Sequence, residues 1–361
     1  MLTVVVPTYK EAANLLPLST RVDEVLKRAG IVYELLIVDD CSPDDTVSVC
    51  ERLVEQFPLR LLQPGGRPRD LSLSVIDGIR AANHDLVLVM DADLSHPPEK
   101  IPEMVSLLST SPGAFVVGSR YVQGGSFDRS WSLWRFINSH IATMLARPLV
   151  KCLDPMSGFF LFDRRYIGEI DALRPLGYKI GLELMVRGHF DEIIEVPIAF
   201  ADREIGASKM NLTQQVKYLR HLRLLYLYKF GGLAEFVHFG VVGASGFIVD
   251  VTFYYSLQLL GVPHQIARGI SFWPAVSWNW MMNRMTTFGG RKRRPKGRQW
   301  LEFTGASLLG FSVSFGVYVL LTSSIEFFDR YRELAFIAGV LSASILNFTM
   351  STLFVYSEKR R

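Results

Sequence analysis

The sequence predicts an α/β domain that binds a nucleotide, followed by interfacial helices and an all-α transmembrane domain. Three observations support this prediction. In the first hundred residues, short apolar strands alternate with amphipathic helices, a pattern typical of parallel β-α-β units. Acidic side chains follow three of these strands. In the last third of the 361-residue chain, long apolar segments follow one another.

Composition and charge exclude several classes of protein. The chain is 49% hydrophobic with a net charge of +4, and residues 291–298 contain six Lys or Arg and no acid. Between apolar segments, such a run indicates a loop beside anionic lipid rather than a nucleic-acid site, so no nucleic-acid partner is expected. The three cysteines form no C-x-x-C pair, which argues against structural zinc and a disulfide framework. Because the chain begins directly with a strand at 3–6, we expect no signal peptide and a cytosolic first domain.

The elements of the first domain follow from hydrophobic periodicity. They are a strand at 3–6, a helix that ends near Gly30, a strand at 34–38, a second helix, a strand at 59–62, a Gly/Arg/Pro loop at 64–70, a helix at 72–83 and a strand at 86–90. Asp45 or Thr46 is predicted to cap the second helix.

The strand at 86–90 runs directly into Asp91-Ala92-Asp93. Residues two apart on an extended chain face the same side, and open α/β sheets bind ligands at the carboxyl ends of their strands. Two carboxylates there would suit a hard divalent cation carrying phosphates. A polar turn is the alternative. Acidic ends at Tyr9/Glu11 and Asp39/Asp40 should converge on the same edge, which favours a nucleotide-plus-metal site.

Several motifs resemble family 2 glycosyltransferases with the GT-A fold, which is Rossmann-like. The motifs are Val-Val-Pro-Thr-Tyr-Lys-Glu at 5–11, Val-Asp-Asp-Cys-Ser at 38–42 and Asp-Ala-Asp-Leu-Ser-His-Pro-Pro-Glu at 91–99. Three later motifs resemble dolichyl- or polyprenyl-phosphate mannose synthases: Gly-Ser-Arg-Tyr-Val at 118–122, Asp-Pro-Met-Ser-Gly-Phe-Phe at 154–160 and Arg-Glu-Ile-Gly-Ala-Ser-Lys at 203–209. The resemblance covers residues 1 to about 230.

The resemblance implies a role for each matching residue. Asp91 and Asp93 would bind Mg²⁺ or Mn²⁺ and, with Arg120, form the catalytic set. The implied donor-binding residues are Pro7, Tyr9, Glu11, Ile37, Asp39, Asp91, Ala92, Asp93, Ser95, Arg120, Lys179, Arg203 and Lys209. The sequence departs from close relatives at Ser95, where Gln is frequent, and at Asp70, where a Lys-Gly pair is common. These departures leave the donor base and sugar open.

The chemistry of glycosyl transfer to a lipid phosphate needs cations more than a base. A divalent cation stabilises the leaving diphosphate, and a phosphate acceptor is already an anion. For His84 and His96, which flank the acidic motif, we expect turn or surface roles. Arg120, Arg135 and Ser139 are predicted to bind the acceptor phosphate, because the arginine fork suits phosphate.

Two of these assignments have alternatives. Arg135 could instead contact a lipid headgroup. Arg203 and Lys209 are predicted to lie in a lid over the diphosphate, with a solvated loop as the alternative.

The rest of the chain is predicted to contact the membrane. The whole chain is predicted to consist of a catalytic domain at 1–212, an amphipathic interfacial helix at 213–233 and a four-helix transmembrane domain at 234–361. Residues 136–145 also carry an apolar stripe, and packing against the sheet domain is the alternative for both segments.

The four predicted spans are 236–260, 266–288, 301–325 and 334–356. The basic loop at 290–299 and the C-terminus would then lie on the cytoplasmic side with the catalytic domain. Residues 240–246 resemble GtrA-like membrane domains. Asp250 is an intramembrane carboxylate, for which a functional role is the default expectation. The alternative is a structural role near a helix end or in a pair with Arg268 or Arg284.

These features imply a membrane-bound, inverting glycosyltransferase that moves mannose from GDP-mannose to dolichyl or polyprenyl phosphate. UDP-glucose is the alternative donor. The non-enzymatic alternative is a protein that binds or flips polyprenyl lipids. A processive polysaccharide synthase is disfavoured because the chain lacks a Q-x-x-R-W motif. Nothing in the sequence indicates an oligomeric state.

Overall fold

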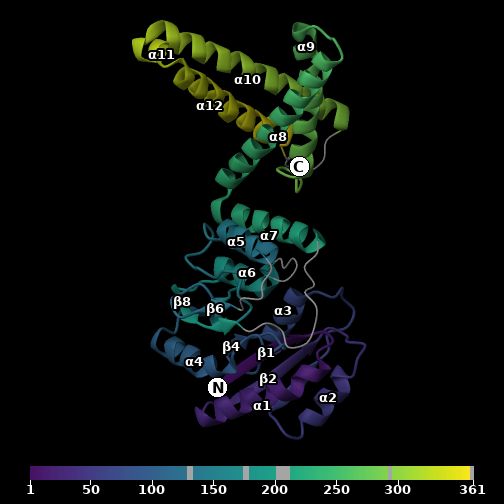
Figure 1. Ribbon diagram of the computed structural model, residues 1–361, viewed down its shortest axis with the longest axis vertical. Helices are drawn as coiled ribbons and strands as arrows, with labels where there is room; N and C mark the ends of the chain where they lie inside the picture. Colours follow the sequence, from purple (N-terminus) through teal and green to yellow (C-terminus); the bar gives the residue numbers. More distant parts are fainter. Residues whose placement is uncertain (128–132, 174–178, 201–211, 292–294, 358–361) are drawn as a thin grey trace. The chain divides into compact units, whose positions relative to one another are not determined.

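The computed structural model describes residues 1–127, 133–173, 179–200, 212–291 and 295–357, and side chains at 127, 133–136, 212 and 213 lie outside the described part. The chain divides into two compact units, residues 1–229 and 230–361 (Figure 1).

The first unit is built on a mixed sheet. Its described strands are β1 (Leu2–Thr8), β2 (Tyr33–Asp39), β3 (Leu59–Leu62), β4 (Leu86–Val89), β5 (Ala114–Ser119), β7 (Phe160–Asp163) and β8 (Glu192–Pro197), in the order β3-β2-β1-β4-β7-β5-β8. The prediction of parallel β-α-β units is confirmed for β1 to β4. It fails at β7, which lies between β4 and β5 and runs antiparallel to both. Two short strands, β6 (Ser126–Phe127) and β9 (Ala199–Phe200), pair separately.

Helices cover both faces of this sheet. They are α1 (Ala12–Arg28), α2 (Thr46–Leu53), α3 (Leu71–Ala81), α4 (Ile101–Thr110), α5 (Leu133–Ala146), α6 (Ile180–Arg187) and α7 (Leu212–Phe230), with short 3-10 turns at 98–100, 164–166 and 170–172. Asp45 is the N-cap residue of α2, as predicted, but its side chain makes no capping hydrogen bond. The carboxylate of Asp44 instead accepts the backbone N–H and the hydroxyl of Thr46, at 3.3 and 2.6 Å.

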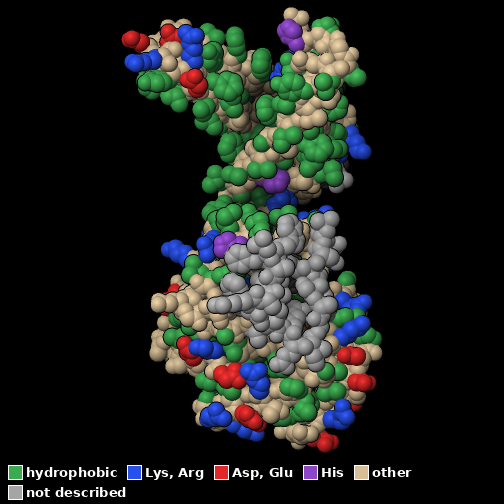
Figure 2. All heavy atoms as spheres, in the orientation of Figure 1, with side chains coloured by type: hydrophobic (Ala, Val, Ile, Leu, Met, Phe, Trp, Pro, Cys, Tyr) green, Lys and Arg blue, Asp and Glu red, His purple; other side chains and the backbone are tan. Residues whose placement is uncertain are grey.

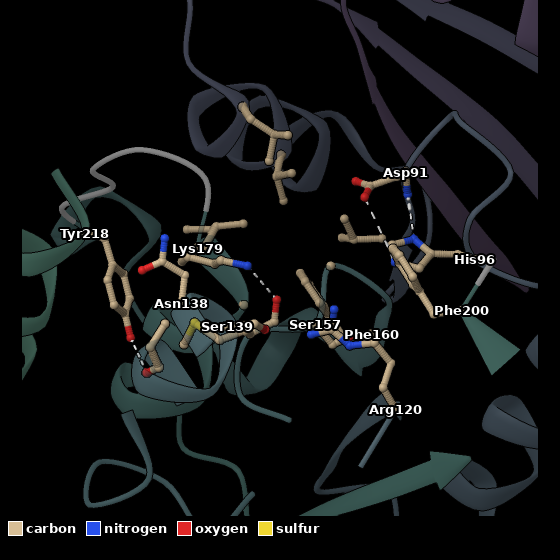
Figure 3. Close-up of a pocket in the computed structure, with 18 of the residues that line it drawn as sticks. Asp91, His96, Arg120, Asn138, Ser139, Ser157, Phe160, Lys179, Phe200 and Tyr218 are labelled. Atoms are coloured by element: carbon tan, nitrogen blue, oxygen red, sulfur yellow. Dashed lines mark hydrogen bonds and ion pairs between the residues drawn. The ribbon is translucent and has the colours of Figure 1, made fainter. Parts of the chain in front are cut away.

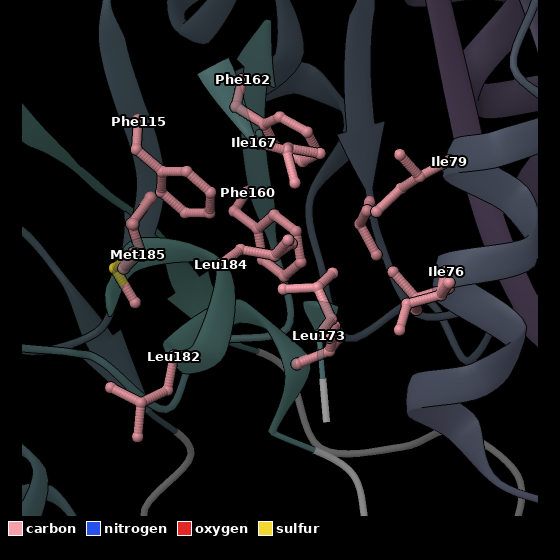
Figure 4. Packing of buried hydrophobic residues seen from close by; sticks show 14 of the residues in the cluster. Ile76, Ile79, Phe115, Phe160, Phe162, Ile167, Leu173, Leu182, Leu184 and Met185 are labelled. Carbon is pink, nitrogen blue, oxygen red and sulfur yellow. The ribbon is translucent and has the colours of Figure 1, made fainter. Parts of the chain in front are cut away.

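The core has two layers because successive residues of a buried strand point to opposite faces. Val4, Val6 and Ile37 pack against α1 and α4 on one face. On the other face, Phe160 and Phe162 pack with side chains of α3 and α6, including Ile76, Ile79, Leu182 and Leu184 (Figure 4). Helix α7 joins this second layer.

The predicted interfacial helix packs against the sheet unit through one face. Tyr218, Leu222 and Leu225, at i, i+4 and i+7, are buried in the second layer. The alternative of packing on the sheet domain is therefore correct for this face, and contact of α7 with a bilayer stays a prediction.

The second unit is helical. Its described helices are α8 (Gly232–Leu259), α9 (His264–Met285), α10 (Lys296–Ser324), α11 (Glu326–Arg330) and α12 (Arg332–Met350), which continues as a π-helical turn over Ser351–Val355. Within the described residues, three helices are long and apolar enough to cross a bilayer: 232–259, 296–324 and 332–355. Hydrophobic side chains gather over the surface of this unit (Figure 2). The chain is therefore an integral membrane protein.

The fourth predicted span, 266–288, forms helix α9 but is not among these three helices, because Arg, Asn, Ser, Trp and Pro residues are spread along its length and make it less apolar. Helix α9 packs against α8, and Arg268 forms an ion pair with Asp250 across this hairpin. This ion pair agrees with the structural alternative for Asp250, with Arg268 as its partner. The pairing also explains how two charges are accommodated in an apolar unit.

Candidate active site

The carboxyl ends of β1, β2 and β4 lie side by side, because β1 pairs in parallel with both neighbours. The N–H of Asp40 donates to the carbonyl oxygen of Thr8 across 3.0 Å. The described non-glycine residues with left-handed backbone are Lys10 (φ 62°), Cys41 (φ 56°) and Leu94 (φ 61°), one after each of these strands. Such strain concentrates at ligand sites. The predicted convergence of the three strand ends is confirmed.

Asp91 is oriented by a buried histidine. The backbone N–H of Asp91 donates to Nδ1 of His96 across 3.0 Å, and Nε2 of the same ring lies 4.0 Å from Oδ2 of Asp91. The ring stacks on Phe159 with 5.2 Å between centroids. Burial lowers the pKa of His96, against the opposing effect of nearby carboxylates. A surface role for His96 is wrong, because only 2% of the side chain is exposed, whereas its bond to the N–H of Asp91 agrees with the predicted turn role.

Asp93 is held by Ser95. Its Oδ1 accepts the hydroxyl of Ser95 at 2.6 Å and the backbone N–H of Ser95 at 3.2 Å. The left-handed conformation of Leu94 closes this turn. Both side chains are buried. Ser95 thus fixes the Asp93 carboxylate, while Ala92 between the two acids packs into the core.

The two carboxylates fit a hard divalent cation that arrives with phosphate. Among the described residues, no group of three or more His, Cys, Asp or Glu could hold a metal by itself. Mg²⁺ commonly takes one or two carboxylates and completes its shell with water and substrate phosphate. The carboxylate of Asp91 is 33% exposed and lines a cavity, as this arrangement requires.

Arg120 is fixed by Asp154, whose carboxylate is fully buried. Nε and Nη2 of Arg120 donate to the two oxygens of Asp154 at 2.7 and 2.8 Å, and the backbone N–H of Arg120 adds a third bond at 3.1 Å. Glu195 accepts the N–H of Asp154 at 3.0 Å. Burial alone would lower the pKa of Arg120, but the bond to Asp154 outweighs burial and raises it. Arg120 therefore stays charged although its side chain is only 10% exposed.

A cavity of about 370 Å³ connects these groups to an apolar wall. At one end it is lined by Asp91, His96 and Arg120, and Lys179 lies between these side chains and Tyr218 (Figure 3). At the other end α5 and α7 contribute Ile141, Ala142, Leu145, Tyr218 and Leu219. Two basic side chains, Arg120 and Lys179, therefore share one cavity with an apolar surface.

Lys179 lies at the centre of the cavity (Figure 3). Its Nζ donates to the carbonyl oxygen of Met156 across 2.8 Å. Burial, reinforced by the charge of Arg120, lowers the pKa of Lys179 to about 8. A phosphate in the cavity would favour its charged form.

Ser139 is the described member of the predicted acceptor group on α5. Its hydroxyl is 3.2 Å from the hydroxyl of Tyr121 and lines the cavity. Arg120 stacks over the rings of Tyr121 and Phe200, at 5.5 and 5.3 Å from the ring centroids. The structure thus brings Arg120 and Ser139 to the same cavity.

The predicted donor residues divide into two groups. Pro7 lines the cavity together with Asp91, Arg120 and Lys179. The other described ones are outside its lining: Tyr9, Glu11, Ile37, Asp39, Ala92, Asp93 and Ser95. Arg203 and Lys209 lie outside the described residues. Arg135 belongs to α5, but its side chain is outside the described part.

The strand ends beside the cavity carry polar contacts of their own. Asp39 accepts the hydroxyl of Ser42 at 2.5 Å and the amide of Gln63 at 3.1 Å. Arg69 donates to the hydroxyl of Tyr9 and stacks over its ring at 4.7 Å. Glu11 accepts the amide of its neighbour Asn14, and Ile37 is buried in the core.

Sequence reasoning missed Asp154, His96 and the lining residues Met156 to Gly158. The available signal was the Asp-Pro-Met-Ser-Gly motif, which supplies Asp154 and this lining. A Cβ added at Gly158 would lie 3.3 Å from the His96 ring and 3.5 Å from the Asp91 carboxylate, so glycine permits this close approach. Phe200 also lines the cavity and was not predicted.

Comparison with known proteins identifies the family. Residues 3–171 match glycosyl transferase family 2, and residues 238–356 match the GtrA/DPMS transmembrane domain. The chain is 34% identical over 323 residues to the dolichol-phosphate mannosyltransferase of Pyrococcus furiosus, covering 88% of this chain and 90% of that protein. It is 38% identical over 237 residues to the dolichol-phosphate mannosyltransferase of Mycosarcoma maydis, covering 63% of this chain and 80% of that protein.

A solved structure supports the fold. Mannosyl-3-phosphoglycerate synthase from Rubrobacter xylanophilus superposes with a TM-score of 0.51 and 16% identity, over 64% of this chain and 75% of that one. The first unit is thus a GT-A-like α/β domain with a mixed sheet. The chain belongs to the dolichol-phosphate mannosyltransferases, which are family 2 glycosyltransferases, and carries a GtrA/DPMS transmembrane domain.

Proposed function

We propose that this enzyme transfers mannose from GDP-mannose to dolichyl phosphate or another polyprenyl phosphate, with inversion at the anomeric carbon. One observation carries the proposal: a single cavity joins Asp91, Arg120 and Lys179 to the apolar side chains of α5 and α7. A water-soluble acceptor would not need that hydrocarbon wall. A lipid phosphate needs both the charged end and the apolar end of the cavity.

In this proposal the acidic side chains bind the metal ion and the basic side chains bind phosphate groups. Asp91 and Asp93 would hold Mg²⁺ or Mn²⁺, which neutralises charge on the leaving diphosphate when bound. Lys179 contributes a cation between the Asp91 end of the cavity and the apolar wall. Arg120, held in place by Asp154, binds the acceptor phosphate with the hydroxyl of Ser139.

The reaction requires no proton transfer. An anionic oxygen of the acceptor phosphate forms a bond to the anomeric carbon of mannose, while the bond from that carbon to the diphosphate oxygen breaks and GDP leaves as an anion. His96 is unsuited to act as a base, because its Nδ1 already accepts the N–H of Asp91. Preorganised cations supply the catalysis instead.

The membrane is the source of the acceptor in this proposal. Ile137, Ile141 and Met144 on α5 and Leu219 on α7 are exposed apolar side chains of the first unit. They suit contact with lipid at the surface of a bilayer. Four crossings by α8, α9, α10 and α12, with the catalytic domain and the C-terminus in the cytoplasm, complete the proposed arrangement.

The test is a transfer assay with the purified full-length protein, polyprenyl phosphate, Mg²⁺ or Mn²⁺, and a panel of labelled nucleotide sugars. We expect lipid-linked mannose from GDP-mannose. Lipid-linked glucose from UDP-glucose would support the alternative donor. No lipid-linked sugar from any donor would contradict the proposal and favour a protein that only binds or moves polyprenyl lipids.

A further inference from the structure

A carboxylate with no role in the proposed reaction lies fully buried between α6 and α7. Oε1 of Glu183 is 3.0 Å from Nε of Arg187 on the same helix, and Oε2 accepts Nε2–H of His221 on α7 at 3.1 Å. His221 is as deeply buried as Glu183. A buried carboxylate destabilises the fold unless it is paired. Apolar residues of similar volume often stabilise the folded state as well as a buried charged pair does. The pair therefore calls for an explanation other than stability.

The pair links two walls of the cavity. The segment that begins α6 supplies Lys179, Ile180 and Gly181 to the lining, and α7 supplies Gln215, Tyr218 and Leu219. Glu183 lies one turn beyond the first group, and His221 lies one turn beyond the second. Arg187 makes a second α6–α7 contact over the ring of Tyr228, 4.4 Å from its centroid.

Apolar packing alone defines the register of α7 weakly. Its buried face consists of Tyr218, His221, Leu222 and Leu225. If α7 moved by three residues, Leu222 would replace Leu225 and Leu219 would replace Leu222, while Gln215 would replace Tyr218, so leucine would be kept at two of the three apolar positions. The same movement would place Tyr218 opposite Glu183 and leave the carboxylate without its histidine partner. A single buried polar pair is an effective device for fixing helix register.

We propose that Glu183 and His221 are positioning residues that fix the register of α7 and thereby place Gln215, Tyr218 and Leu219 as the wall facing the lipid acceptor. This inference rests on the proposed function for its kinetic consequence. The hydroxyl of Tyr218 donates to the carbonyl oxygen of Ala142 on α5 at 2.7 Å, so the register of α7 also sets its contact with α5. Loss of the pair should affect the acceptor and spare the donor.

The test compares two amides at one position in the full-length protein. In His221→Gln, the amide nitrogen reaches the position of Nε2 and keeps the bond to Glu183. In His221→Asn, the side chain is one methylene shorter than that of glutamine and cannot reach the carboxylate of Glu183. We expect His221→Asn to raise KM for polyprenyl phosphate about tenfold with KM for GDP-mannose nearly unchanged, and His221→Gln to restore most of the loss. His189→Leu, at an exposed histidine, is the control and should change neither constant.

Amide hydrogen exchange gives a readout that does not depend on turnover. Exchange within residues 214–228 should be faster in His221→Asn than in the wild type and should return towards the wild-type rate in His221→Gln. If wild-type protein transfers no sugar but exchange follows this order, the proposed function fails and the positioning role stands. Equal exchange in the two amide variants, or a joint rise of both KM values, would overturn the positioning role. GDP binding by each variant verifies that the donor end is folded.

Discussion

The guanidinium of Arg120 and the carboxylate of Asp154 form a two-point bond of 2.7 and 2.8 Å, with Asp154 fully buried. Removal of one partner of such a pair leaves an uncompensated charge in the protein interior. Asp154→Ala should therefore lower the unfolding free energy of the sheet unit by about 3 kcal/mol and should weaken use of the lipid acceptor. Chemical denaturation followed by circular dichroism, together with acceptor KM, measures both effects.

The matched control is Asp171→Ala. Asp171 pairs with Arg80 at the surface, where its side chain is 90% exposed. Exposed ion pairs add little to the unfolding free energy, so Asp171→Ala should not change it measurably. Equal destabilisation by both variants would contradict the importance given to the Arg120–Asp154 bond.

The acidic pair gives a prediction about metal binding. Asp93→Asn should abolish turnover, because the carboxylate that would bind the cation is lost. Ser95→Ala removes the 2.6 Å bond to Asp93 but keeps the carboxylate, so it should weaken Mn²⁺ binding several-fold and leave turnover at saturating Mn²⁺ largely intact. Titration of Mn²⁺ by electron paramagnetic resonance, with GDP present, checks this. Unchanged affinity in Ser95→Ala would remove Ser95 from the metal environment.

Lys179 predicts a pH dependence. Its pKa is lowered to about 8, so its positive charge is present below pH 8 and is lost as the pH rises through that value. The kcat/KM for the donor should therefore decline on the alkaline side of about pH 8. In Lys179→Arg the guanidinium stays charged, and the decline should move to higher pH. An identical alkaline limb in both proteins would show that another group causes it.

Arg135 tests the acceptor side. Arg135→Ala should raise KM for polyprenyl phosphate while KM for GDP-mannose stays within about twofold, because removing an acceptor-binding side chain from α5 leaves the donor site intact. Steady-state kinetics with each substrate varied in turn gives both constants. Equal acceptor affinity in the variant would instead favour a lipid-headgroup contact for Arg135.

The number of crossings predicts where the C-terminus lies. If α9 crosses the bilayer with α8, α10 and α12, single cysteines introduced at 290 and 357 should both be labelled from the side of the catalytic domain. The native cysteines would first be replaced. If α9 does not cross, both positions should lie on the opposite side of the bilayer from the catalytic domain. Labelling of intact and opened vesicles with an impermeant maleimide distinguishes these outcomes.

Local sequence was sufficient for the elements around the acidic motif. Strands β1 to β4 were predicted because each has an apolar run bounded by turn residues, and their parallel order follows from the helices between them. The same alternation predicted that Asp39 and Asp91 lie at the same edge of the sheet, where β2 and β4 end on either side of β1. For β7 the sequence was insufficient, because its partner Val89 on β4 lies far from Phe160 along the chain and only long-range pairing selects its place.

Side-chain partnerships depended on the tertiary structure in the same way. Asp154 and Arg120 are 34 residues apart, and His221 and Glu183 are 38 apart, so no local periodicity connects them. His96 reads as a turn residue in sequence and is buried only because Phe159 and Phe200 arrive from later segments.

The sequence by itself determined the acidic strand ends and the change to an apolar, membrane-spanning composition, because these depend on residue type and short spacing. Its resemblance to family 2 glycosyltransferases implied the class of enzyme. The tertiary structure decided which cations share a cavity with the apolar wall, how Asp91, Asp93 and Arg120 are held, and that one face of α7 packs on the sheet unit. The physical reason is that burial and pairing are properties of segments brought together from distant positions, where each partner supplies only half of the interaction.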